Sequence, residues 1–72
     1  MIKQFNSYAE VKNLQINDVC IIKNKINYYD VVRCVGKHKE GKENLSCLAP
    51  SILTLNDAFN IADTYARIGT KL

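Results

Sequence analysis

The stretch that decides the fold runs from residue 55 to residue 68 and reads LNDAFNIADTYARI. At about 100° per residue, its apolar side chains fall on one half of a helix and its polar side chains on the other half. The polar half consists of Asn56, Asp57, Asn60, Asp63, Thr64 and Arg67. Gly69 follows the last apolar position, as is common after a helix. The pattern therefore predicts an amphipathic helix that packs on the rest of the chain.

The apolar half of this helix has a middle and a border. The residues near the middle are expected to pack on a sheet, and they are Leu55, Phe59, Ala62 and Ala66. Ile61 and Ile68 lie at one border, next to Tyr65. This border gives the helix more apolar surface than its central line of contacts requires.

Three runs rich in β-branched and aromatic residues precede the helix. They span residues 19–23, 28–35 and 44–49, and residues 24–27 form a turn between the first two. Pro50 and Ser51 are expected to end the third run, because proline lacks the N–H that a ladder needs. The sequence therefore predicts three antiparallel strands.

Near the N-terminus, Ser7 and Glu10 have the spacing of a capping box, which predicts a short helix from Tyr8 to Asn13. The resulting order is α-β-β-β-α in a single domain over residues 1–72. We expect a small α+β fold with a three-stranded antiparallel sheet, a short N-terminal helix and a packed C-terminal amphipathic helix.

The second predicted strand is apolar on both faces. One face carries Tyr29, Val31 and Val35, and the other carries Tyr28, Val32 and Cys34. An antiparallel sheet that packs on one helix usually has a polar outer face. A second cover is therefore expected, from the N-terminal helix in part and from a second copy or a partner protein for the rest.

Length and composition exclude several classes of function. The chain has 72 residues and a net charge of +3, and it is too short for a two-domain cleft or a Rossmann dinucleotide site. It contains no apolar run of about 20 residues, and its first residues lack the apolar core of a signal peptide, so we expect a cytoplasmic protein without a membrane span. Eight Lys, eight Asn and eight Ile are typical of AT-rich genomes, such as those of many phages and mobile elements.

The residues that could carry chemistry are few. Cys20, Cys34 and Cys47 each lie within an apolar run and are expected to be reduced, mostly buried thiols. With His38 they could supply four zinc ligands, but the Cys-x₂₋₄-Cys spacing of zinc sites is absent. No phosphate-binding loop or catalytic pair of carboxylates occurs either. We therefore expect no catalytic residue, no metal and no cofactor.

The main functional hypothesis is a non-enzymatic protein-binding module. It would occlude a surface of a larger protein, as a phage or mobile-element inhibitor of a host protein would. The expected contact residues are Tyr28, Asp30, Arg33, Ile61 and Tyr65, because tyrosine and arginine are favoured in interfaces and the helix has a surplus apolar border. The alternative for Asp30 and Arg33 is a cross-strand ion pair of small net value.

A second hypothesis is a dimeric nucleic-acid-binding or regulatory protein that uses the loop from Lys37 to Lys42. Its contact residues would be Lys23, Lys25, Lys37, His38, Lys39 and Lys42. Consecutive hairpins place their turns at opposite ends of a sheet, so these residues are not expected to form one continuous basic surface.

Overall fold

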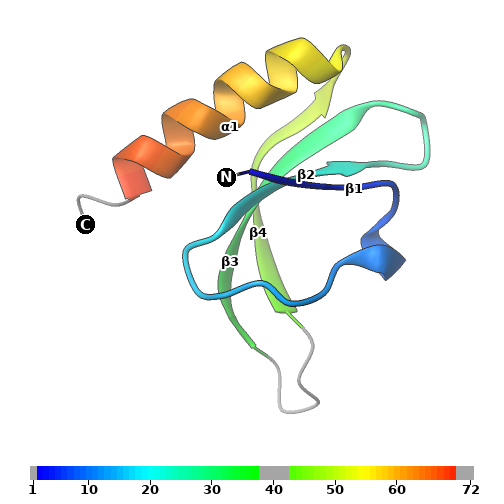
Figure 1. Cartoon of the computed structure of the whole chain (residues 1–72). Helices are drawn as coiled ribbons and strands as arrows, with labels where there is room; N and C mark the ends of the chain where they lie inside the picture. The colour runs from blue at the N-terminus through cyan, green and yellow to red at the C-terminus, as the bar shows by residue number, and fades with distance from the viewer. Residues whose placement is uncertain (1, 38–42, 70–72) are drawn as a thin grey trace.

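The computed structural model describes residues 2–37 and 43–69. Strands and helices follow one another along the chain (Figure 1) in the order β1 (Lys3–Phe5), the 3₁₀ turn η1 (Tyr8–Glu10), β2 (Val19–Lys23), β3 (Tyr29–Lys37), β4 (Glu43–Ile52) and α1 (Leu55–Gly69). The sheet order is β1-β2-β3-β4. The predicted α+β class is confirmed, and so is the C-terminal helix.

The sheet is mixed and has one strand more than the sequence predicted. β2 and β4 pair with β3 in antiparallel fashion, as expected. β1 pairs parallel to β2, with Lys3 opposite Cys20 and Phe5 opposite Ile22. This strand was missed because three residues, two of them polar and exposed, carry almost no local β signal.

The predicted N-terminal helix is wrong beyond its first turn. η1 ends at Glu10, and Val11 already has extended backbone angles. The Ser7 hydroxyl lies 3.4 Å from a Glu10 carboxylate oxygen and does not cap a backbone N–H. So short a helix gains few hydrogen bonds, whereas extended backbone after Glu10 carries Leu14 to the sheet, where it is fully buried.

β4 does not end at Pro50, as the sequence predicted. Tyr29 lies opposite Ile52 and Val31 opposite Ala49, so Pro50 and Ser51 together face the single residue between them on β3. This is a β-bulge, with Ser51 in the left-handed region at φ 51°. Proline fits there because β4 is an edge strand and its outer side needs no ladder N–H.

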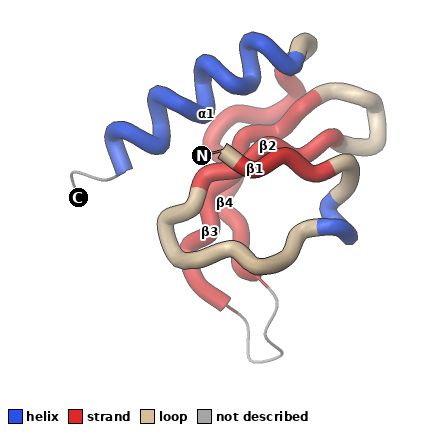
Figure 2. Tube along the Cα trace, in the orientation of Figure 1, coloured by secondary structure: helices blue, strands red, loops and turns tan. Residues whose placement is uncertain are grey.

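Both faces of the sheet are apolar and covered. On one face, Val19, Ile21 and Val31 pack against Ala58 and Ala62 of α1. On the other face, the segment between β1 and β2 crosses the sheet (Figure 2). There Phe5, Val11 and Leu14 pack against Cys20, Ile22, Val32 and Cys34. The chain thus supplies the second cover from its own N-terminal segment.

The line of α1 that faces the sheet differs slightly from the predicted one. Ala58 and Ala62 are fully buried, and their small side chains let the helix lie close to the strands. Phe59, expected near the middle of the contact, is 37% exposed. The buried line therefore runs through Ala58 and Ala62, which brings Ile61 closer to the sheet.

Leu14→Ala tests the N-terminal segment as a cover. We expect it to lower the free energy of unfolding by about 2–5 kcal/mol, because it removes buried methyl groups and leaves a cavity. The matched control is Ile16→Ala, since Ile16 is 64% exposed and its loss should change stability by less than about 0.5 kcal/mol. Urea denaturation measures both, and equal stability of the two variants would contradict this role of Leu14.

Candidate protein-binding groove

α1 begins directly after β4 and runs back across the sheet (Figure 1). The Thr54 hydroxyl accepts the Asp57 N–H at 3.2 Å, and the Thr54 carbonyl accepts the Ala58 N–H at 3.1 Å. Thr54 is thus the N-cap, and Asp57 in the first turn complements the helix dipole. The short connection places α1 over the face of the sheet that β2, β3 and β4 form.

An open groove of about 480 Å³ lies between α1 and β4. Its lining residues are Ala49, Asn60, Ile61, Thr64, Tyr65 and Ile68. Ile61 and Tyr65 are half-buried, and Ile68 is 54% exposed. The groove is therefore bounded by the apolar border of the helix that the sequence singled out.

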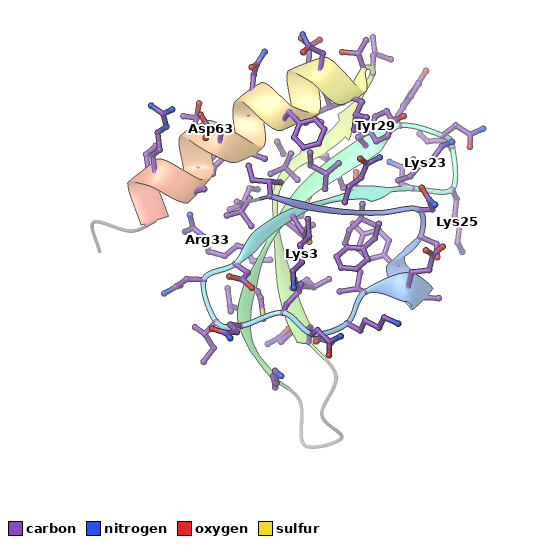
Figure 3. All side chains as sticks on the ribbon, in the orientation of Figure 1. Lys3, Lys23, Lys25, Tyr29, Arg33 and Asp63 are labelled. Carbon is purple, nitrogen blue, oxygen red and sulfur yellow. The ribbon has the colours of Figure 1, made fainter. Side chains whose placement is uncertain are left out.

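Arg33 approaches this groove from the sheet. It lies on β3 beneath the C-terminal half of α1 (Figure 3), and it donates a guanidinium hydrogen bond to the Tyr65 carbonyl at 2.7 Å. Its Nε is buried and has no hydrogen-bond partner within the described part of the chain. The positive charge lies near the negative end of the helix dipole, which stabilises the docking of α1.

No described carboxylate neutralises Arg33. The ion pair that the structure shows in residues 2–37 and 43–69 joins Asp63 to Arg67 at 3.0 Å, on the exposed side of α1. Figure 3 shows Asp63 on the far side of the helix from Arg33. The alternative of sheet-edge or cross-strand ion pairs for Arg33 and Asp30 is not formed among the described residues. A half-buried positive charge without a counter-ion among the described residues thus lies next to Tyr65, which lines the groove.

Two of the five predicted contact residues lie away from the groove. Tyr28 is 37% exposed at the turn between β2 and β3. Asp30 is only 8% exposed, on the face of the sheet opposite to α1. The structure therefore brings together Arg33, Ile61 and Tyr65, and separates them from Tyr28 and Asp30.

Asp30 is buried and is the centre of a part-buried hydrogen-bond network. Its carboxylate accepts the Tyr8 hydroxyl at 2.6 Å, the Asn24 side-chain amide at 3.0 Å and the Ser51 N–H at 2.8 Å. Burial alone would raise the pKa of Asp30, but the hydrogen bonds from Ser51, Tyr8 and Asn24 outweigh burial and hold this pKa below its ordinary value. Burial, together with the hydrogen bond to Asp30, raises the pKa of the Tyr8 hydroxyl, which therefore stays protonated as the donor.

The residues of the nucleic-acid hypothesis do not form one surface in the described part of the chain. Lys23 and Lys25 lie at the turn between β2 and β3 (Figure 3), whereas Lys37 ends β3. Nine residues of strand separate the two ends, which is about 26 Å at ~3.3 Å per residue. The other predicted residues, His38, Lys39 and Lys42, lie outside the described residues.

The cysteines show no activated thiol. Cys20 and Cys34 are buried in one cluster, Cys47 is exposed, and all three are free of disulfides. Burial raises the pKa of Cys20 to about 11, with the nearby Cys34 and Asp18 adding to the shift. Burial also raises the pKa of Cys47. Both thiols are therefore protonated near neutral pH and weakly nucleophilic.

Whether the three cysteines converge with His38, the open question for a zinc site, lies partly outside the described residues, because His38 is not among them. Within residues 2–37 and 43–69, no group of three His, Cys, Asp or Glu side chains is close enough to hold a metal ion. In the same residues, no helix has the length and apolar character needed to cross a membrane.

Three residues that line the groove could not be identified from the sequence. Ala49, Asn60 and Thr64 line it, yet their types carry no signal of binding. Ile68 was recognised at the border of the helix but was not included among the contact residues. Its helical spacing from Ile61 and Tyr65 could have placed it there.

Comparison of the chain with protein-family models, with curated proteins and with solved structures gave no match.

Asp30→Asn tests the buried network through the pH dependence of stability. The folded-state pKa of Asp30 lies below its ordinary value of 3.8, so the unfolded chain binds more protons in acid. The stabilisation by Asp30 is complete above about pH 4, and it is lost as the pH falls through the folded-state pKa. We expect the variant to be about 1–3 kcal/mol less stable than the unmodified chain at pH 7. This difference in stability between the two chains should shrink as the pH falls toward about 2.5.

Denaturant unfolding at a series of pH values measures this difference. The control is Asp63→Asn, because Asp63 is exposed and its pair with Arg67 contributes little. An Asp30→Asn curve parallel to that of the unmodified chain would contradict the linkage.

Proposed function

We propose that this chain is a non-catalytic protein-binding module, and that its groove between α1 and β4 holds a surface of a larger partner protein. The observation that carries the proposal is the apolar border of α1, formed by Ile61, Tyr65 and Ile68, next to a guanidinium without a counter-ion. Tyrosine and arginine are enriched among residues that dominate binding energy, particularly beside apolar neighbours that exclude water.

The contact set of the proposal differs from the one expected from sequence. It keeps Arg33, Ile61 and Tyr65 and adds Ile68, which is exposed at the end of the groove. Asp30 is omitted because its carboxylate is buried and already accepts hydrogen bonds from three groups. Tyr28 is omitted because it lies at the turn between β2 and β3, away from the groove.

The proposed mode of action is occlusion. A module that occupies a partner's surface blocks that surface to other molecules without doing chemistry, as an inhibitor or modulator does. A phage or mobile-element origin, which the composition suggests, and a cytoplasmic location are part of this proposal. The nucleic-acid hypothesis has less support, because Lys23 and Lys25 lie at the opposite end of the sheet from Lys37.

Site-specific photo-crosslinking tests this proposal. A photo-reactive amino acid replaces Ile68 in one variant and Ile26 in another, since both side chains are exposed, at 54% and 62%. Each tagged variant is irradiated in nuclease-treated lysate of the organism that encodes the chain. We expect a protein adduct of defined mass from position 68 and none from position 26.

Two results would oppose the proposal. Equal adducts from both positions would show that the groove has no special role in binding. Loss of every adduct on nuclease treatment, with nucleic acid crosslinked in the untreated sample, would favour the nucleic-acid hypothesis instead.

A further inference from the structure

The inference concerns how the groove holds its occupant, and it rests on the proposed function. We propose that an extended segment of the partner protein adds a fifth strand beside β4, with apolar side chains beneath α1 and a carboxylate near Arg33. Three independent features of the described residues support this mode: an open strand edge, an exposed apolar helix border toward that edge and an uncompensated charge.

The first feature is the outer edge of β4. This ten-residue strand is last in the sheet order, and none of the described residues pairs with its outer side. The opposite edge strand, β1, has only three residues. An edge strand directs N–H and C=O groups of alternate residues outward, where they can pair with a further strand.

The regular part of this edge is short. Leu45, Ser46 and Cys47 oppose consecutive residues of β3, so their backbone has the geometry of an undistorted ladder. The pairing is irregular on both sides of this run. Val35 is an extra residue on β3 between the pairs Cys34–Leu45 and Gly36–Asn44, and Pro50 lies in the bulge beyond Cys47. Strand addition is therefore limited to a short segment beside residues 43–47.

The second feature is the apolar border of α1 on the side toward β4. Ala58 and Ala62 lie over the strands and are fully buried, whereas Ile68 is 54% exposed on the side of the helix toward β4. Neighbouring strands lie about 4.8 Å apart. A strand added beside β4 would therefore lie on the open side of the groove, where side chains directed to the face of α1 could contact the border formed by Ile61, Tyr65 and Ile68.

The third feature is the charge of Arg33. Arg33 lies directly opposite Ser46 on β4, on the face of the sheet that α1 covers. It makes no ion pair among the described residues. An aspartate or glutamate on the added strand, next to Ser46 and directed to the same face, would place its carboxylate near the guanidinium and form a charge-assisted hydrogen bond.

A second copy of this chain fits the same place less well. If two β4 strands paired edge to edge, alternation from Leu45 would direct Asn44 and Ser46 toward the partner's helix. Both side chains are polar and neutral, so they bury no apolar border and bring no carboxylate to Arg33. The partner segment is therefore expected to differ from β4 and to alternate apolar residues with one acidic residue on the same face.

Selection from a displayed library of random decapeptides tests this inference with the full chain as bait. We expect enriched peptides with apolar residues at alternate positions and one Asp or Glu in phase with them. Binding of the best peptide should weaken at least tenfold with Ile68→Ser and stay unchanged with Ile26→Ser, which removes an equally exposed isoleucine.

Changes in the peptide test the mode without any risk to folding of the chain. Replacing the acidic residue by its amide should weaken binding about fivefold or more, and this loss should shrink in high salt. Methylation of backbone nitrogens at alternate positions should abolish binding for one set of positions and leave it intact for the other set, because only one set pairs with β4.

Three results would overturn strand addition. They are selection of no peptide, equal effects of the two sets of methylated nitrogens, and unchanged binding when the acidic residue of the peptide becomes an amide. Dimerisation through β4, seen by sedimentation, would assign the edge to a second copy. The crosslinking experiment judges the proposed function separately, because it requires a partner at Ile68 but no extended segment.

Discussion

The carboxylate of Asp30 joins three segments that are far apart along the chain. It accepts hydrogen bonds from Tyr8 in the N-terminal cover, from Asn24 in the turn between β2 and β3, and from Ser51 in the bulge of β4. Asp30 is only 8% exposed, so without these donors its buried carboxylate would lack partners. The network thus sets the positions of the cover, the turn and the bulge relative to β3.

The groove depends on this arrangement through the bulge. Pro50 and Ser51 occupy the space opposite Asp30, which determines where β4 ends and where Thr54 can cap α1. The direction of α1 across the sheet then follows from the close packing of Ala58 and Ala62. Arg33 adds a hydrogen bond to the Tyr65 carbonyl near the other end of the helix. The apolar border toward β4 is a consequence of these constraints.

Features with a strong local period could be predicted from the sequence. The division of apolar and polar residues over 55–68 gave the helix, and β-branched runs gave β2, β3 and most of β4. β1 could not be predicted, because its parallel pairing with β2 is a non-local interaction of three residues. The helix predicted from Tyr8 to Asn13 is too long, because burial of Leu14 outweighs the capping signal of Ser7 and Glu10. The predicted end of the strand at Pro50 is wrong, because a proline interrupts a strand inside a sheet but is tolerated in a strand at the edge of the sheet.

Part of the candidate site could likewise be predicted from local sequence patterns, and part could not. Ile61 and Tyr65 follow from helical spacing, which is local. Arg33 and Asp30 give the same sequence signal, a charge within an apolar strand, yet one lies at the groove and the other is buried under the N-terminal segment. Only the order of strands and the path of the N-terminal segment separate these two outcomes, and neither can be read from a local pattern.

Amide hydrogen exchange, followed by NMR in the free chain and in its complex, tests most directly whether the edge of β4 beside α1 is the binding surface. The account predicts that outward-facing amides within residues 43–47 exchange rapidly in the free chain and become strongly protected in the complex. Protection confined to the turn between β2 and β3, with unchanged exchange along β4, would contradict it.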